Sequence, residues 1–180
     1  GAPTAVKLIR PERVGPEALQ RFEREVRTTS RLTHPNTVTV YDYGRTPDGT
    51  LYYAMELLEG ATLRQIVELT GPQDPGRVAH ILAMVASALA EAHAIDLIHR
   101  DVKPSNIILT TQGGVPDVAK VVDFGLVKEL SPDPDHPQLS HNAVLAGTPL
   151  YMAPELTKNP ARPSPASDLY ALGAVGYFLL

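Results

Sequence analysis

Two short motifs constrain this chain more than any other feature: a run of residues at 99–106 and a tripeptide at 123–125. The run is His99-Arg100-Asp101-Val102-Lys103-Pro104-Ser105-Asn106, and Asp123-Phe124-Gly125 begins seventeen positions after it ends. Either motif alone could arise by chance. In this order they supply a carboxylate base, a cation and two oxygen ligands for a metal ion. Transfer of a phosphoryl group from a nucleotide needs that set, because its chemistry is mostly positioning and neutralisation of charge.

The composition fits a folded domain and argues against several other classes of protein. A length of 180 residues suits one large domain or two small lobes, and 43% apolar residues are enough for a core. The net charge of −4 gives no reason to expect a nucleic-acid partner. There are no cysteines, and the histidines lack metal-ligand spacing, so we expect neither disulfides nor a zinc site. The absence of cysteine fits the reducing cytoplasm, where we expect this domain to lie.

No part of the sequence is expected to contact a membrane. Lys7 and Arg10 interrupt any early apolar run, and the uncharged stretch 170–180 is too short to span a bilayer. The sequence begins inside a strand-like pattern and ends inside a helical one. We therefore expect a fragment cut at both ends, from a protein that could carry a membrane anchor elsewhere.

The first part of the chain has the pattern of a small sheet with one helix. Alternating or β-branched residues predict strands over 4–9, 37–43 and 51–55. Between the first two strands, apolar residues near helical spacing predict an amphipathic helix over 16–32.

The second part of the chain, after a linker at Glu59 and Gly60, has the pattern of a larger helical unit. A capping box at Thr62 predicts a short helix to about residue 69. Asp74 followed by a proline predicts the start of a long alanine-rich helix that continues to residue 93. The stretch 168–180 predicts another buried helix.

Lys7 and Glu25 are candidates for a second functional pair. A lysine on an edge strand is commonly solvated, and that interpretation stays open. Glu25, on the helix predicted to follow, could instead meet Lys7 across the sheet, and the ion pair would hold the lysine onto nucleotide phosphates. The other charges of this helix are expected to face solvent: Arg21, Glu23, Arg24 and Arg27.

Taken together, the motifs resemble those of the eukaryotic-like serine/threonine protein kinases, in a form similar to the bacterial ones. The matching segments are Ala5-Val6-Lys7, Glu25, the two motifs above, Gly147-Thr148-Pro149-x-Tyr151-Met152-Ala153-Pro154-Glu155 and Asp168-x-Tyr170-x-Leu172-Gly173. Lys103 is typical of the Ser/Thr rather than the tyrosine members. The resemblance implies an α+β, two-lobed fold truncated at both ends, with a partial N-lobe at 1–58 and a partial C-lobe at 59–180.

The resemblance also implies transfer of the ATP γ-phosphate to serine or threonine hydroxyls of proteins, assisted by Mg²⁺ or Mn²⁺. Asp101 would be the base, and the other catalytic residues would be Lys103, Lys7, Glu25 and Thr148. Asn106 and Asp123 would bind the metal ion. The nucleotide would contact Ala5, Lys7, Met55 as gatekeeper, Glu56 and Leu58 of the hinge, Lys103, Ser105, Asn106, Ile108 and Asp123. An internal spine anchored by Asp168 would comprise Thr29, Val40, His99 and Phe124.

Several alternatives and regulatory features remain open at this stage. The glycine-rich phosphate loop expected before Lys7 is absent, so the chain could be a catalytically silent fragment or a pseudokinase that acts as a nucleotide- or partner-binding scaffold. A small-molecule phosphotransferase is disfavoured by the segment 153–155. Arg100 beside the base implies control by phosphorylation, and Ser140, in a proline-rich loop at 129–142, is the candidate site. The resemblance also allows a homodimer.

Overall fold

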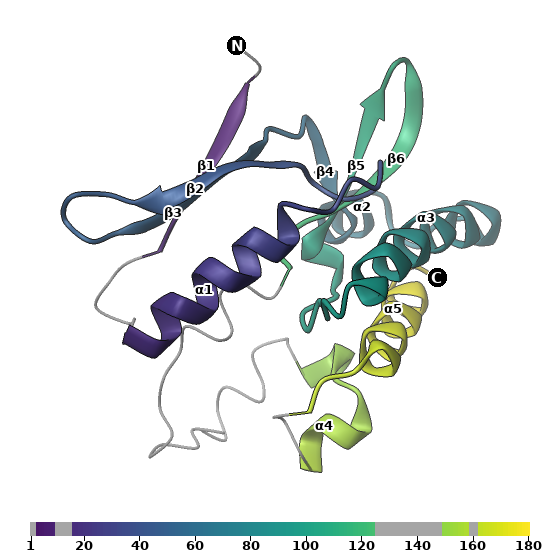
Figure 1. Ribbon diagram of the computed structural model, residues 1–180. Helices are drawn as coiled ribbons and strands as arrows, with labels where there is room; N and C mark the ends of the chain where they lie inside the picture. The colour runs from purple at the N-terminus through teal and green to yellow at the C-terminus, as the bar shows by residue number, and fades with distance from the viewer. Residues whose placement is uncertain (1–2, 10–15, 125–148, 159–161) are drawn as a thin grey trace.

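The computed structural model describes residues 3–9, 16–124, 149–158 and 162–180 (Figure 1). Its apolar residues gather into two separate clusters, a small one in the first part of the chain and a larger one in the second. The lobe boundary that we place after residue 58 stays a prediction.

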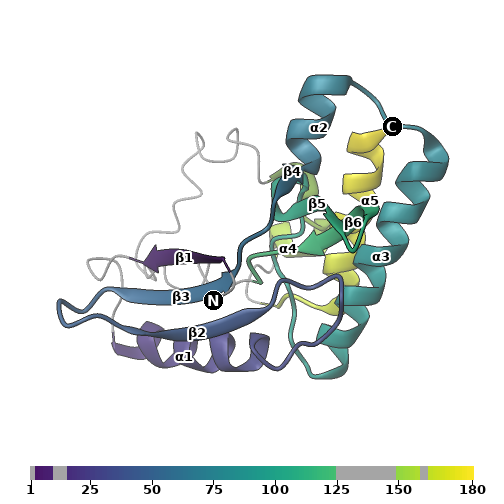
Figure 2. The same ribbon diagram turned by 90° about the horizontal axis from the view of Figure 1, so that it is seen from above.

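The first part is a three-stranded antiparallel sheet with one helix along it (Figures 1 and 2). The strands are β1 (Thr4–Ile9), β2 (Val40–Arg45) and β3 (Leu51–Glu56), in the order β1-β3-β2, and the helix is α1 (Pro16–Thr29). Helix and sheet bury a core of Ile9, Phe22, Val26, Leu51 and Tyr53. The strand predicted over 37–43 lies a few residues later, because Thr37 instead forms a parallel bridge with Val121 in the second part.

The second part combines helices with a second three-stranded sheet. Its elements are β4 (Gly60–Thr62), α2 (Leu63–Thr70), α3 (Pro75–Ala94), β5 (Ile107–Gln112), β6 (Val115–Val121), α4 (Pro154–Lys158) and α5 (Pro165–Leu179). The sheet order is β4-β5-β6, and α3 packs against both β6 and α5. The larger core therefore lies between this sheet and the two long helices.

Gly60, which the sequence marks as linker, is instead the first residue of β4. It pairs with Thr110 in β5, and a β-carbon added at Gly60 would lie only 2.1 Å from the carbonyl oxygen of Leu109. A glycine is needed here because the two backbones approach too closely for any side chain.

Three helices of the second part, α2, α3 and α5, begin where side chains satisfy free backbone N–H groups. The predicted capping box of Thr62 is present at α2, and Asp74 accepts hydrogen bonds from two N–H groups at the start of α3. A further box formed by Ser164 and Ser167 caps α5. This helix therefore starts a few residues before the predicted residue 168.

Within the described residues, two backbone connections join the first part to the second. One is the chain itself, which passes from β3 to β4 through residues 57–59. The other is the 36–38 bridge, in which Val38 N donates to Val121 O (3.0 Å) and Val121 N donates to Asn36 O (2.8 Å). The Asn36 amide also donates to Ala119 O (2.7 Å). The start of β2 is thereby held against the end of β6, just before Asp123.

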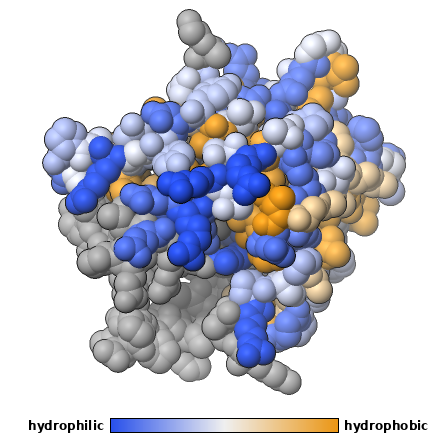
Figure 3. Space-filling view, in the orientation of Figure 1, coloured by the Kyte–Doolittle hydropathy of each residue, from blue (hydrophilic) through white to orange (hydrophobic). Residues whose placement is uncertain are grey.

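The surface is of mixed polarity. On the face shown in Figure 3, hydrophilic side chains cover much of the centre, and a smaller apolar patch lies beside them. None of the helices in the described part of the chain reaches the length and hydropathy that a bilayer crossing needs.

Candidate active site

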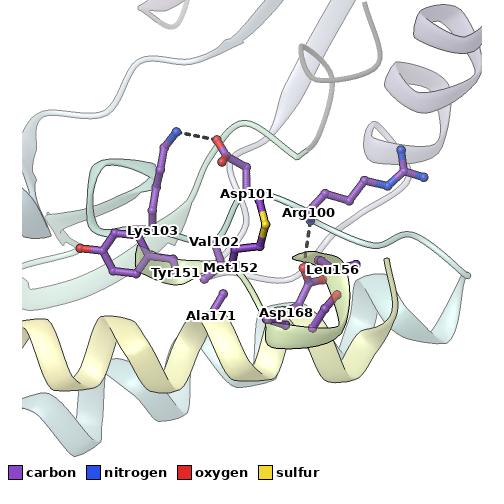
Figure 4. A pocket seen from close by; sticks show the side chains of 11 residues that line it. Arg100, Asp101, Val102, Lys103, Tyr151, Met152, Leu156, Asp168 and Ala171 are labelled. Atoms are coloured by element: carbon purple, nitrogen blue, oxygen red, sulfur yellow. Dashed lines mark hydrogen bonds and ion pairs between the residues drawn. The ribbon is translucent and has the colours of Figure 1, made fainter. Parts of the chain in front are cut away.

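The loop at 99–106 is anchored from below by one buried carboxylate. Asp168, in the first turn of α5, is 2% exposed and accepts hydrogen bonds from His99 N (2.8 Å) and Arg100 N (2.9 Å). It also contacts the Nε2 atom of His93, on α3, at 2.8 Å. Figure 4 shows the contact with Arg100. These contacts hold Arg100 at a φ of 66°, a left-handed conformation that non-glycine residues rarely adopt.

His99 ties this loop to the strand that leads into Asp123. Its Nδ1 atom accepts from Asp101 N (3.2 Å), so Nε2 carries the proton that is donated to Val122 O (3.1 Å). The ring is completely buried, 4.6 Å from the ring of Phe124 between centroids, and burial lowers the pKa of His99. A neutral imidazole with this tautomer satisfies both contacts.

Asp101, Lys103 and Asn106 form one polar cluster. The Asp101 Oδ2 atom lies 2.6 Å from Lys103 Nζ and accepts from Asn106 Nδ2 at 3.0 Å. Asn106 ends a short turn (Pro104–Asn106) and is 7% exposed. Because its amide nitrogen is committed to Asp101, its carbonyl oxygen is the atom that can bind a cation.

Asp123 lies under the first sheet, with both carboxylate oxygens engaged. Lys7 Nζ lies 2.7 Å from Oδ2, and the Tyr53 hydroxyl donates to Oδ1 at 2.6 Å. Burial raises the pKa of Tyr53, and so does the negative charge of Asp123. Sequence analysis missed Tyr53. The available signal was its position two residues before Met55, which puts both side chains on the same face of β3.

The expected ion pair between Lys7 and Glu25 is absent from the described part of the chain. Lys7 pairs with Asp123, and Glu25 Oε1 accepts from Arg100 Nη1 at 3.1 Å. The tertiary fold brings Arg100 of the loop at 99–106 up to α1 and Asp123 up to β1, so each charge has another partner. The solvated-lysine interpretation is also wrong, since the Lys7 side chain is only 35% exposed and is paired.

The residues expected to bind the nucleotide lie on β1, β3 and β5 and in the loops next to β3, β5 and β6. Ala5 and Met55 are cross-strand neighbours in the first sheet. The Glu56 carboxylate contacts Lys120 Nζ at 3.0 Å and accepts from the Gln112 amide at 3.2 Å. Three further positions are half-buried: Leu58, Ser105 and Ile108. Thr148 and Ser140 lie outside the described residues.

A pocket lies beside the loop, between it, the segment 151–156 and α5 (Figure 4). Its walls are formed by Arg100, Asp101, Val102, Lys103, Tyr151, Met152, Ala153, Leu156, Ser167, Asp168 and Ala171. Asp101 and Lys103 are therefore both among the residues that line it.

The family model described as protein kinase domain matches residues 1–180. The chain belongs to the protein kinase domain family. It is 42% identical over 160 residues to the serine/threonine-protein kinase Pkn3 of Myxococcus xanthus, and this match covers 89% of the chain. It is 39% identical over 182 residues to the serine/threonine-protein kinase PknA of Mycobacterium tuberculosis. The chain spans 29% of the length of Pkn3 and 40% of that of PknA.

A solved structure supports the same assignment. The crystal structure of Rad53 residues 1–466 in complex with AMP-PNP matches 98% of this chain with a TM-score of 0.75 and 25% sequence identity. The match covers 40% of the Rad53 chain. The kinase fold and the resemblance to bacterial serine/threonine kinases that the motifs predict are both confirmed.

Proposed function

We propose that this chain is the catalytic part of a protein kinase that transfers the γ-phosphate of ATP to serine or threonine hydroxyls of proteins. The observation that carries the proposal is the cluster in which Asp101 contacts both Lys103 (2.6 Å) and Asn106 (3.0 Å) beside an open pocket. The pocket can admit a hydroxyl-bearing side chain next to the base. The names of the relatives support the substrate class, since Pkn3 and PknA are both serine/threonine-protein kinases.

In this mechanism Asp101 orients the attacking hydroxyl and accepts its proton at the carboxylate. General base catalysis of this kind typically contributes about 10²–10⁴-fold. Lys103, whose ammonium group lies against the same carboxylate, neutralises charge on the transferred phosphoryl group. Asp168 keeps the base in place by holding the two residues that precede it.

The residues of the site fit a magnesium ion. Asn106 offers a carbonyl oxygen and Asp123 a carboxylate, and Mg²⁺ is usually held by one or two such protein oxygens together with phosphates and water. When bound, the ion would neutralise phosphate charge as it develops. Lys7 holds the phosphates of ATP after it leaves Asp123, and Glu25 must leave Arg100 if it is to support Lys7 from α1.

The test is Mg²⁺-dependent transfer of labelled phosphate from ATP to a generic protein acceptor and to the protein itself. The full gene product, the 180-residue chain and the Asp101→Asn variant of the full product are compared, with Asp96→Asn as a matched control at an exposed position just after α3. We expect transfer that Asp101→Asn reduces by at least about 10²-fold and that Asp96→Asn leaves intact.

Two other outcomes would contradict the proposal. A folded full product that binds ATP but transfers nothing would favour the scaffold hypothesis, and transfer to small molecules alone would favour a small-molecule phosphotransferase. Phosphopeptide mapping of the same reactions tests the hypothesis that Ser140 is autophosphorylated, and absence of phosphate there would refute it.

A further inference from the structure

Tyr53 is a buried polar residue that the proposed mechanism does not use. It lies on β3 directly opposite Lys7 of β1, and it is only 1% exposed. Its ring packs in the core of the first part, 6.5 Å from the ring of Phe22 between centroids. Its hydroxyl reaches out of that core and donates to Asp123.

Tyr53 and Lys7 form a clamp on the carboxylate of Asp123. The Tyr53 hydroxyl lies 2.6 Å from Oδ1 of Asp123, and Lys7 Nζ lies 2.7 Å from Oδ2. The Lys7 ammonium is also 5.9 Å from the centre of the Tyr53 ring, so the two donors support each other from adjacent strands. Both oxygens of Asp123 are therefore engaged by donors of the first sheet.

We propose that Tyr53 is a positioning residue that holds Asp123 against the first sheet and competes with Mg²⁺ for its carboxylate. This inference rests on the proposed function, in which Asp123 is a metal ligand. A donated hydrogen bond at Oδ1 stabilises the carboxylate in its present orientation and withdraws negative charge from it. The Tyr53 hydroxyl thus raises the concentration of Mg²⁺ needed to turn Asp123 toward the nucleotide.

A role in packing alone makes a different prediction for the hydroxyl. Tyr53→Phe keeps the buried ring and its neighbour Phe22, and removes only the bond to Asp123. If Tyr53 served only in packing, Tyr53→Phe would leave the Mg²⁺ dependence of nucleotide binding unchanged. A residue that restrains Asp123 would change the Mg²⁺ dependence of nucleotide binding even when no phosphate is transferred.

The neighbouring Tyr52 provides a matched control. Its hydroxyl also donates to an aspartate, Asp42 at 3.3 Å, but this pair lies on the exposed side of the sheet away from the clamp. Tyr52→Phe therefore removes the same atom from the same strand without touching Asp123.

The experiment is an equilibrium titration of AMP-PNP binding to the full gene product as the Mg²⁺ concentration is raised, with no acceptor present. The half-saturating Mg²⁺ concentration is measured for the wild type and for Tyr53→Phe, Tyr52→Phe and Asp123→Asn, after thermal melting has established that each is folded. We expect about a tenfold decrease in this concentration for Tyr53→Phe, since a hydrogen bond to a charged group is lost, and no change for Tyr52→Phe.

An unchanged or increased half-saturating concentration in Tyr53→Phe would overturn the inference. If this variant does not fold, Tyr53→Met, which keeps a buried apolar side chain, is expected to give the same decrease and carries the test. Failure of the proposed function would look different: Asp123→Asn would then retain the Mg²⁺ dependence of the wild type. That result would remove the metal role of Asp123 and the inference with it.

Discussion

Replacement of Asp168 by asparagine tests whether one buried carboxylate supports the loop at 99–106, which contains the proposed base. In the structure Oδ1 of Asp168 accepts from Arg100 N, and Oδ2 accepts from His99 N and contacts His93. An asparagine of the same size has only one acceptor oxygen. Even in its better orientation, with the oxygen in place of Oδ2, it leaves the N–H of Arg100 facing an amide nitrogen.

The expected cost follows from that single lost contact. A hydrogen bond to a charged group contributes about 1.5–3 kcal/mol, so we expect Asp168→Asn to lower the free energy of unfolding by about 2 kcal/mol. The loss falls on Arg100, whose left-handed backbone conformation is otherwise unfavourable. Because Asp101 comes next in the chain, phosphate transfer is expected to fall more than stability alone explains.

Urea unfolding followed by circular dichroism gives the stability. Phosphate transfer, measured without urea and at a temperature well below the thermal midpoint, gives the activity. Asp96→Asn serves as control: Asp96 is exposed, has a φ of 59°, and asparagine tolerates that conformation well. We expect the control to stay within about 0.5 kcal/mol of the wild type. An Asp168→Asn protein with the wild-type urea midpoint and full activity would refute the argument.

Two further predictions concern buried or partly buried polar groups. Thr29 is 3% exposed, and its hydroxyl has no hydrogen-bond partner among the described residues, so Thr29→Val is expected to raise the free energy of unfolding by about 1 kcal/mol. Calorimetry should show that Thr110→Val, in contrast, lowers the free energy of unfolding, because the Thr110 hydroxyl donates to a backbone carbonyl. Although burial of Glu91 acts to raise its pKa, hydrogen bonds from residues 33–34 outweigh it and hold the pKa below the ordinary value. The stability that this carboxylate contributes is thus present at neutral pH and lost as the pH falls through the lowered pKa. The urea midpoints of the wild type and Glu91→Gln should therefore differ at neutral pH and converge in acid. A difference that stays constant with pH would contradict this.

Local signals in the sequence were sufficient for the starts of α2 and α3. The capping box at Thr62 and the Asp74–proline pair act through residues only two or three positions away, and both are present in the structure. Gly60 shows where such signals end. Gly60 was interpreted as part of a linker, but a glycine is needed there because Leu109, on a strand far along the chain, approaches closely.

In the candidate site, too, some contacts follow from spacing in the sequence and others depend on the tertiary fold. Asp101, Lys103 and Asn106 lie within six residues, so their spacing alone predicts that they meet. The partners of Lys7 and Glu25 could not be chosen from spacing, because several opposite charges compete and only the tertiary fold decides which is within reach. The role of Tyr53 depends on the register between β1 and β3, which no residue pattern specified.

The 36–38 bridge has a mechanical consequence. Together with the passage from β3 to β4, it attaches the first part of the molecule to the second at two backbone points, and two fixed points define an axis of rotation. The contacts of Lys7 and Tyr53 with Asp123, and of Glu25 with Arg100, are instead made by side chains. If the first part rotated about that axis, these side-chain contacts would have to break, whereas the two backbone connections could stay in place.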